Sequence, residues 1–464
     1  MRLEFHGAIQ TVTGSAYVLQ IGAERFLFDC GMYQGASWLE KRNFLPFYFD
    51  PRQIKDVIVT HAHIDHIGLL PKLVREGFAG KIHATSATVD LARILLLDAA
   101  HIAEADTERR NRKFGRAGRP QEQPLYTAAD AEKALEHLVA HRYHEEVPIG
   151  DGLRVVFRDA GHILGSAFIQ ATATENGNTR RILFSGDIGN RDQAIIKDPE
   201  APEPADVLLI ESTYGDRLHK PRPDTMKELH DILAQAYRDG GNVVIPAFAV
   251  GRTQEILYRL RELADEGRLP AFRVFVDSPL AISATRIVQD NPDCYDDETI
   301  YEISASGRDP LAVPNLRFTR QTIESQEINN VKEPCLIISA SGMCNAGRIL
   351  HHLKHNLWRR ENHIVFVGYQ GEGTLGRLLV DGAPRVKIMG EEVAVAAHIH
   401  TIGGFSAHAD RDGLLEWMQP LAAGKPRTFI VHGEEKSAAA FAGEVNRRYG
   451  IRPVLPLWHE KVLL

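Results

Sequence analysis

Residues 61–67, His-Ala-His-Ile-Asp-His-Ile, place three imidazoles and one carboxylate within six positions. The stretch follows the apolar run 57–59 and precedes a helix-like segment that begins at Gly68. On a helix, His61 and His63 would point to nearly opposite sides, so a strand end or loop is expected here. There the two histidines can converge on one metal ion, while Asp65 and His66 turn toward a second.

The ligand types in this stretch favour a catalytic site. Neutral imidazole and carboxylate suit zinc and similar cations, and the lack of cysteine argues against a structural finger-type site. The alternative is a polar surface loop that happens to be rich in histidine. The strand and helix predicted on either side disfavour that alternative.

The bulk composition is that of an ordinary soluble globular protein. A chain of 464 residues predicts two domains, or three. The formal net charge of -7 gives no general argument for nucleic-acid binding, although a local basic groove stays open. Cationic residues gather between Arg109 and Arg119, where Gly115, Gly118 and Pro120 favour a solvated loop over a nucleic-acid contact.

Cysteine usage and the N-terminus bear on the cellular compartment. The four cysteines are scattered with no CxxC pair, which predicts reduced thiols in a cytoplasmic protein. The N-terminal segment has no signal-peptide core, and no apolar run is long enough to span a membrane. We therefore expect a soluble, cytoplasmic protein with no membrane contact. The cysteines are Cys30, Cys294, Cys335 and Cys344.

Predicted apolar strands repeatedly end in a candidate ligand. In a layered α/β protein, strand ends at one edge come together to form the site. Taken alone, His162 would more often be a packed core histidine, and Asp29 would be either a turn cap or a partner of a metal-bound histidine. The residues at these strand ends are Asp29, the His61 loop, His162, Asp187, Glu211 and His432.

From Pro221 the chain alternates helix and strand, which predicts a doubly wound domain with a parallel sheet. No GxxxxGK[ST] motif is present, so nucleoside triphosphate chemistry is not indicated. The turns at 339–342 and 250–253 place backbone amides, hydroxyls and Arg252 at helix N-termini. Such termini bind anions, phosphate included, although most are simply well capped.

Together these motifs resemble the metallo-β-lactamase superfamily, and specifically its β-CASP nuclease branch, over essentially the whole chain. The HxHxDH signature is 61–66, and the other superfamily positions are Asp29, His162 and Asp187. The branch-specific trio is Glu211, His408 in Phe-Ser-Ala-His, and His432. In this branch, RNA-cleaving members typically carry Glu and His at the first and last of these positions, whereas DNA-repair members tend to carry Asp and Val. The resemblance therefore implies an RNA nuclease, similar to the minimal prokaryotic relatives of the pre-mRNA 3′-end cleavage endonuclease.

The resemblance also implies the fold. The expected class is α/β, with an αββα metallo-β-lactamase sandwich built from residues 1–208 and 384–464. A parallel-sheet β-CASP domain, residues 209–383, is expected to be inserted into it. This agrees with the change in sequence pattern near Pro221.

The implied chemistry is hydrolysis of RNA phosphodiester bonds with two Zn²⁺ ions per chain, leaving 5′-phosphate and 3′-hydroxyl ends. Asp29 would orient a ligand histidine, and His408, polarised by Glu211, would protonate the departing 3′ oxygen. One zinc is expected on His61, His63 and His162, and the other on Asp65, His66 and His432, with Asp187 bridging both. Residues expected to hold a neighbouring phosphate are Arg252, Ser339, Ser341 and Ser406.

The expected substrate is single-stranded RNA, and the expected role is in RNA processing or degradation. The sequence leaves open whether cleavage is internal or proceeds from 5′ to 3′. It also leaves open whether the protein forms a homodimer. One alternative is another hydrolase on the same metal core, a thioesterase or lactonase. Glu211, His408 and the insert argue against it, because carbonyl chemistry needs no phosphate-holding domain. A non-catalytic RNA-binding subunit is the other alternative, and the complete ligand set argues against it.

Overall fold

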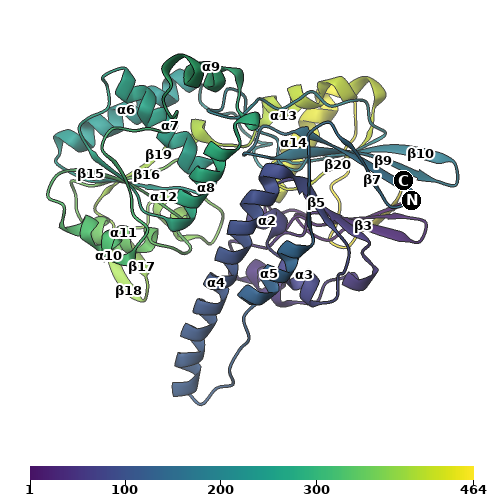
Figure 1. The fold of residues 1–464 in the computed structure, drawn as a ribbon, viewed down its shortest axis with the longest axis horizontal. Coiled ribbons are helices and arrows are strands. Elements are labelled where there is room, and N and C mark those ends of the chain that lie inside the picture. Colours follow the sequence, from purple (N-terminus) through teal and green to yellow (C-terminus); the bar gives the residue numbers. More distant parts are fainter. The chain divides into compact units, whose positions relative to one another are not determined.

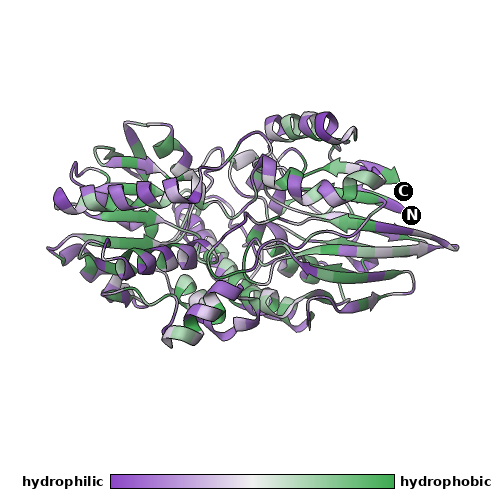
Figure 2. Cartoon of the chain, turned by 90° about the horizontal axis from the view of Figure 1, so that it is seen from above, coloured by the Kyte–Doolittle hydropathy of each residue, from purple (hydrophilic) through white to green (hydrophobic).

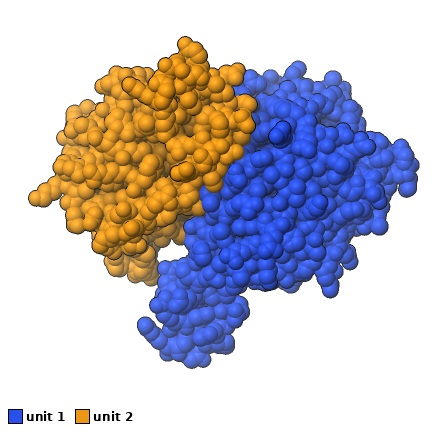
Figure 3. All heavy atoms as spheres, in the orientation of Figure 1, with its two compact units in different colours: residues 1–191, 198–218, 408–464 blue, residues 192–197, 219–407 orange.

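The computed structural model describes residues 1–464 (Figure 1). Its strands are largely hydrophobic, whereas many helices carry hydrophilic residues along their length (Figure 2). The chain divides into two compact units (Figure 3). Unit 1 comprises residues 1–191, 198–218 and 408–464, and unit 2 comprises residues 192–197 and 219–407.

The first sheet of unit 1 has seven strands in the order β21-β1-β2-β3-β4-β5-β6. The strands β21, β1, β2 and β3 pair antiparallel, and β3, β4, β5 and β6 pair parallel. The bounds are β1 Arg2–Phe5, β2 Tyr17–Ile21, β3 Glu24–Phe28, β4 Asp56–Ile58, β5 Ile82–Thr85, β6 Leu138–His141 and β21 Lys461–Leu463.

The second sheet of unit 1 has six strands in the order β20-β11-β10-β9-β8-β7. The strand β20 pairs parallel with β11, so residues more than 200 positions apart in the sequence become neighbours in this sheet. The bounds are β7 Glu146–Ile149, β8 Leu153–Asp159, β9 Ala167–Glu175, β10 Asn178–Phe184, β11 Val207–Ile210 and β20 Arg427–Ile430.

The two sheets of unit 1 enclose one hydrophobic core. The rings of Phe28 on β3 and Phe184 on β10 stack across it with centroids 3.7 Å apart. The outer face of the second sheet is covered by helices, as shown by Leu208 and Ile210 packing in one buried cluster with Leu414 and Phe441. The αββα sandwich is confirmed. The principal helices are α3 Leu70–Arg75, α4 Ser86–Arg116 and α5 Ala128–Glu136 beside the first sheet, and α13 Arg411–Met418 and α14 Glu435–Tyr449 on the second.

Short helices complete unit 1. They are α1 Ser37–Glu40 and α2 Ile64–Ile67, with single turns at Lys41–Phe44, Pro51–Gln53 and Gln419–Gly424.

Unit 2 contains a six-stranded sheet in the order β14-β13-β15-β12-β16-β19, and every neighbouring pair is parallel. The predicted parallel sheet is thus confirmed. Its strands are β12 Val243–Pro246, β13 Arg273–Val276, β14 Leu316–Phe318, β15 Cys335–Ser339, β16 His363–Phe366 and β19 His398–Thr401, and a hairpin is formed by β17 Arg385–Ile388 and β18 Glu391–Ala394.

The helices of unit 2 alternate with its strands, as the sequence pattern predicted. They are α6 Arg222–Arg238, α7 Arg252–Asp265, α8 Pro279–Asp290, α9 Asp297–Ser306, α10 Thr322–Glu327, α11 Ile349–Asn356 and α12 Leu375–Val380, with single turns at Pro292–Cys294, Ile328–Asn330 and Gly403–Phe405.

Both boundaries of the inserted unit lie further along the chain than the expected 209 and 383. Apart from the short stretch 192–197, the chain enters unit 2 after Leu218 and leaves it after Ala407. The first shift arises because β11 and Glu211 belong to the second sheet of unit 1. The second arises because β19 pairs with β16 and so extends the sheet of unit 2.

One local expectation was wrong. The cationic run was expected in a loop, but α4 continues to Arg116, because arginine and lysine are good helix formers and a single glycine near a helix end is tolerated. Figure 3 shows the far end of this helix projecting from the body of unit 1. The helix α5 ends at Glu136, because residues 138–141 pair in parallel with β5.

The four cysteines are all free, as predicted, and three of them are buried. No helix is both long enough and apolar enough to cross a lipid bilayer.

Replacing Phe184 with alanine removes one ring of the stack between the sheets. The loss of a buried aromatic side chain should lower the free energy of unfolding by about 3–5 kcal/mol. Urea unfolding followed by circular dichroism measures this change. The matched control is Phe44→Ala in the same unit, where the side chain is 55% exposed. A loss of equal size in both variants would contradict the assignment of the core.

Candidate metal centre

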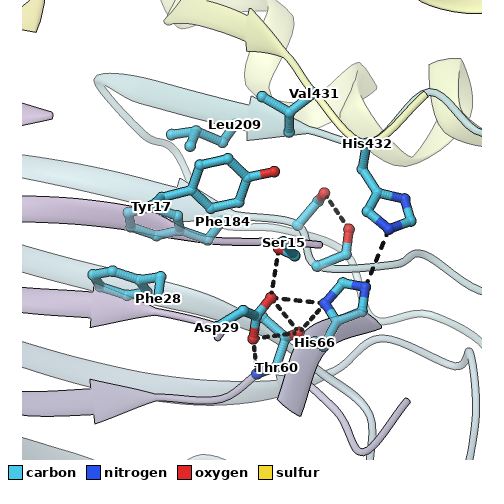
Figure 4. A pocket seen from close by; sticks show the side chains of 12 residues that line it. Ser15, Tyr17, Phe28, Asp29, Thr60, His66, Phe184, Leu209, Val431 and His432 are labelled. Atoms are coloured by element: carbon cyan, nitrogen blue, oxygen red, sulfur yellow. Dashed lines mark hydrogen bonds and ion pairs between the residues drawn. The ribbon is translucent and has the colours of Figure 1, made fainter. Parts of the chain in front are cut away.

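The candidate ligands of unit 1 lie at the ends of strands and at the start of a short helix. His61 and His63 follow β4, whereas Asp65 and His66 lie in α2. The remaining three follow β8, β10 and β20, respectively: His162, Asp187 and His432. The backbone of His432 is left-handed, with φ of 46°, and turns its ring toward His66 (Figure 4).

One group of ligand atoms is formed by His61, His63, His162 and Asp187. His63 Nδ1 lies 3.1 Å from His61 Nε2 and 3.2 Å from His162 Nε2. Asp187 Oδ2 lies 3.5 Å from His61 Nε2 and 3.6 Å from His162 Nε2. Three imidazoles and one carboxylate therefore face a common point.

A second group is formed by Asp65, His66 and His432. The Nε2 atoms of His66 and His432 are 3.2 Å apart, and Asp65 Oδ2 is 3.5 Å from His432 Nε2. Asp187 Oδ2 lies 3.3 Å from His66 Nε2, so the same oxygen borders both groups. The structure thus brings all seven predicted ligands together within unit 1.

These distances fit metal coordination better than hydrogen bonding. Ligands of a tetrahedral ion at about 2.0–2.1 Å lie roughly 3.3 Å from one another. His63 Nδ1 faces two other ring nitrogens at nearly that spacing. Asp187 Oδ1 is buried and accepts no hydrogen bond from the protein. The residues present therefore fit a metal site.

Burial keeps the first group of histidines in the form that binds metal. Burial lowers the pKa of His61 and His162 well below its usual value, and that of His63 to about 4. Burial acts the same way on His66, but the carboxylates of Asp187 and Asp29 outweigh it and raise its pKa. A metal ion at His66 would have to replace a proton on that ring.

Asp29 hydrogen-bonds to His66 through the ring nitrogen that points away from the ligand group. Its backbone is left-handed, with φ of 57°, and its Oδ2 accepts from His66 Nδ1 at 2.7 Å and from the hydroxyl of Ser15 at 3.0 Å (Figure 4). Its Oδ1 accepts from the backbone N–H of Thr60 at 2.9 Å. This leaves Nε2 of His66 facing the ligand group, as expected for a carboxylate that orients a ligand histidine.

Two threonines that complete this support were missed from the sequence. The hydroxyl of Thr60 lies 3.0 Å from Asp29 Oδ2, 3.2 Å from His61 Nδ1 and 3.3 Å from His66 Nδ1. The hydroxyl of Thr213 lies 3.2 Å from His432 Nδ1. The available signal was position, because Thr60 immediately precedes His61 and Thr213 follows Glu211 by two residues.

The polar residues that hold the ligand histidines lie against the hydrophobic core of unit 1. A small cavity between the sheets is lined on one side by Asp29, Thr60 and His66 and on the other by Phe28 and Phe184 (Figure 4). The stacked rings of Phe28 and Phe184 therefore pack next to the residues that hold the ligand histidines.

Glu211 and His408 form a pair beside Asp187. Glu211 is fully buried, accepts from the backbone N–H of Ile188 at 2.7 Å, and lies 3.3 Å from His408 Nδ1. Burial lowers the pKa of His408, but Glu211 and then Asp187 outweigh it and raise the pKa to about 9. The imidazole can therefore carry a proton at neutral pH.

The four residues expected to hold a phosphate lie in unit 2. Arg252 is buried at the start of α7, and Ser406 is buried after the turn at 403–405. The hydroxyl of Ser339 donates to Asp277 O at 2.8 Å, and that of Ser341 donates to Ala346 O at 3.2 Å. Both hydroxyls are engaged within unit 2, and phosphate binding by these four residues stays a prediction.

Family models match three parts of the chain. The model described as the metallo-beta-lactamase superfamily matches residues 10–246, and the Beta-Casp domain matches residues 253–379. A model described as a Zn-dependent metallo-hydrolase RNA specificity domain matches residues 392–456. The chain is also similar to Ribonuclease TTHA0252 of Thermus thermophilus, with 42% identity over 95% of each chain. This chain belongs to the β-CASP branch of the metallo-β-lactamase superfamily.

More distant similarities extend over the whole chain. The transcription termination factor FttA of Methanocaldococcus jannaschii is 30% identical over 98% of this chain and 70% of its own length. The FttA protein of Pyrococcus abyssi is 31% identical over the same shares of the two chains. A crystal structure of an Enterococcus faecalis protein of unknown function aligns with a TM-score of 0.56, at 12% identity and over 100% of this chain, and it supports the fold alone.

Thr60→Val keeps the shape of the side chain but removes the hydroxyl shared by Asp29, His61 and His66. Substitutions in the support of metal ligands typically weaken metal binding roughly 10- to 100-fold. Competition with a chromophoric chelator measures this change. Thr60→Ser is the matched control, because it retains the hydroxyl and should bind metal nearly as the unaltered protein does. Equal weakening in the two variants would show that the hydroxyl has no such role.

Proposed function

We propose that this protein is a zinc-dependent ribonuclease that hydrolyses phosphodiester bonds of single-stranded RNA and leaves 5′-phosphate and 3′-hydroxyl ends. The observation that carries the proposal is the complete set of seven ligands beside the pair formed by buried Glu211 and half-buried His408. The name of the Thermus relative and the RNA specificity model support RNA as the substrate. The named termination factors support a role in RNA processing or termination.

His61, His63 and His162 would hold one zinc ion and Asp65, His66 and His432 the other, with Asp187 shared by both. When bound, such ions lower the pKa of water and stabilise negative charge on a phosphate. Two ions separated by a few ångström suit hydrolysis of a phosphodiester, because the attacking and leaving oxygens both develop charge.

The protein's own residues supply the proton that the departing 3′ oxygen needs. Glu211 orients His408 through Nδ1, which leaves Nε2 to donate a proton to the departing 3′ oxygen. The carboxylate of Glu211 is held in turn by the backbone N–H of Ile188, so the pair keeps a fixed geometry. Asp29 and Thr60 keep His66 and His61 in place.

His408→Ala should slow cleavage of 5′-labelled and internally labelled single-stranded RNA by about 10²- to 10⁴-fold, the usual contribution of a general acid. Its bound zinc, measured by elemental analysis, should be unchanged, because His408 is not a member of either ligand group. His351→Ala, which removes an exposed histidine of unit 2, is the matched control and should cleave at the original rate. Turnover of a thioester or lactone while RNA stays intact would contradict the proposal and favour the other hydrolase chemistry.

The chemical groups at the ends of the RNA products show whether the bond from phosphorus to the 3′ oxygen or the bond to the 5′ oxygen is broken. Fragments with a 5′-phosphate should resist labelling by polynucleotide kinase until they are treated with phosphatase. Their 3′ ends should be extendable by a polymerase that needs a free hydroxyl. Immediate kinase labelling of untreated fragments would show a 5′-hydroxyl and would contradict a proton donated to the 3′ oxygen.

A further inference from the structure

A second type of ligand cluster lies wholly within unit 2. Asp239, His363 and His398 each offer one ligand atom, and these three atoms lie within 4.8 Å of one another. Asp239 caps the C-terminus of α6, while His363 and His398 are the first residues of β16 and β19. The two histidines are direct partners in the parallel pairing of these strands (Figure 1). None of the three is a ligand of the centre in unit 1.

His363 is placed as metal-bound histidines are. Its ring is buried, with Nε2 3.4 Å from Asp239 Oδ2 and Nδ1 2.9 Å from Nε2 of His400. The planes of the His363 and His400 rings are nearly parallel, with an interplanar angle of 1°. A ligating histidine usually has its second ring nitrogen hydrogen-bonded, which fixes both the tautomer and the direction of the ligating atom. His400 fills that supporting role here.

The same atom positions serve two proton arrangements. With no ion, His400 can donate through Nε2 to Nδ1 of His363, and Nε2 of His363 can donate to Asp239. With an ion, the proton of His363 sits on Nδ1 and donates to His400, which leaves the Nε2 lone pair facing Asp239. The two arrangements differ in which ring nitrogens carry the protons.

The presence of His398 argues for the ion-binding arrangement. The contacts of His363 with His400 and with Asp239 do not involve His398. The ring centroid of His398 nevertheless lies 4.7 Å from that of His363. Two imidazoles and one carboxylate therefore converge at one place in unit 2.

We propose that Asp239, His363 and His398 bind a further divalent transition-metal ion of the zinc class. Two imidazoles and one carboxylate suit such an ion better than Mg²⁺ or Ca²⁺, which prefer oxygen ligands alone. Three protein ligands leave a position open to water, in keeping with the exposure of Asp239 and His398.

The ion would join three elements of unit 2. It would tie β19, the edge strand of the sheet, to β16 and to the end of α6. Edge strands have hydrogen-bonding partners on one side alone and are the more easily released. Residues 402–407 follow β19 and lead directly to His408. The ion would therefore anchor the last strand before that catalytic histidine.

Equilibrium dialysis of the full-length protein against micromolar zinc, followed by elemental analysis, tests this proposal. His398→Asn should bind one zinc equivalent fewer per chain than the unaltered protein. Asp239→Asn should show the same loss and provides a second variant if the first fails to fold. His351→Ala is the matched control for an exposed histidine of unit 2 and should lose none.

A second readout is the melting temperature. Zinc should raise it more in the unaltered protein than in His398→Asn, because an ion that binds the folded state stabilises that state. Zinc content and melting that are the same in the unaltered protein and both variants would overturn the proposal. Neither measurement depends on RNA cleavage, so failure of the proposed ribonuclease function would leave this result readable.

Discussion

The structure of unit 1 depends on the crowding of ring nitrogens around one buried carboxylate. Five histidines and Asp65 meet at Asp187, with nitrogen–nitrogen distances of 3.1–3.2 Å. Buried polar atoms at such distances are costly unless each finds a partner, and lone pairs facing one another are not partners. Cations resolve this conflict, because each would accept several of these lone pairs at once.

The fold supplies this crowding from distant parts of the chain. His432 reaches the site because β20 pairs with β11, and Asp29 reaches His66 because β3 and β4 run parallel with their ends level. A shift of one residue in either pairing would turn the side chains to the opposite face. The stacked rings of Phe28 and Phe184 join the two sheets and line the same small cavity as Asp29, Thr60 and His66, so the core packs directly against the support of the ligands.

The positions of most candidate ligands could be predicted from the sequence because they lie at the ends of strands. Runs of apolar residues reveal such strands in a single sequence. His162, Asp187 and His432 were predicted at strand ends, and in the structure they follow β8, β10 and β20. Features set by long-range pairing were not predicted. Thr60 acquires its role through the level ends of β3 and β4, and the late exit from unit 2 depends on β19 pairing with β16. The length of α4 was missed because glycine was weighed above the helix propensity of its arginines.

Zinc add-back tests the central claim most directly. The His398→Asn variant, which should carry only the centre in unit 1, is stripped of metal, checked by elemental analysis, and titrated with zinc while RNA cleavage is measured. The account predicts no cleavage without metal and cleavage that rises with bound zinc until two zinc equivalents per chain are bound. Undiminished cleavage by the metal-free protein, or two bound equivalents with no cleavage of any single-stranded RNA, would contradict it.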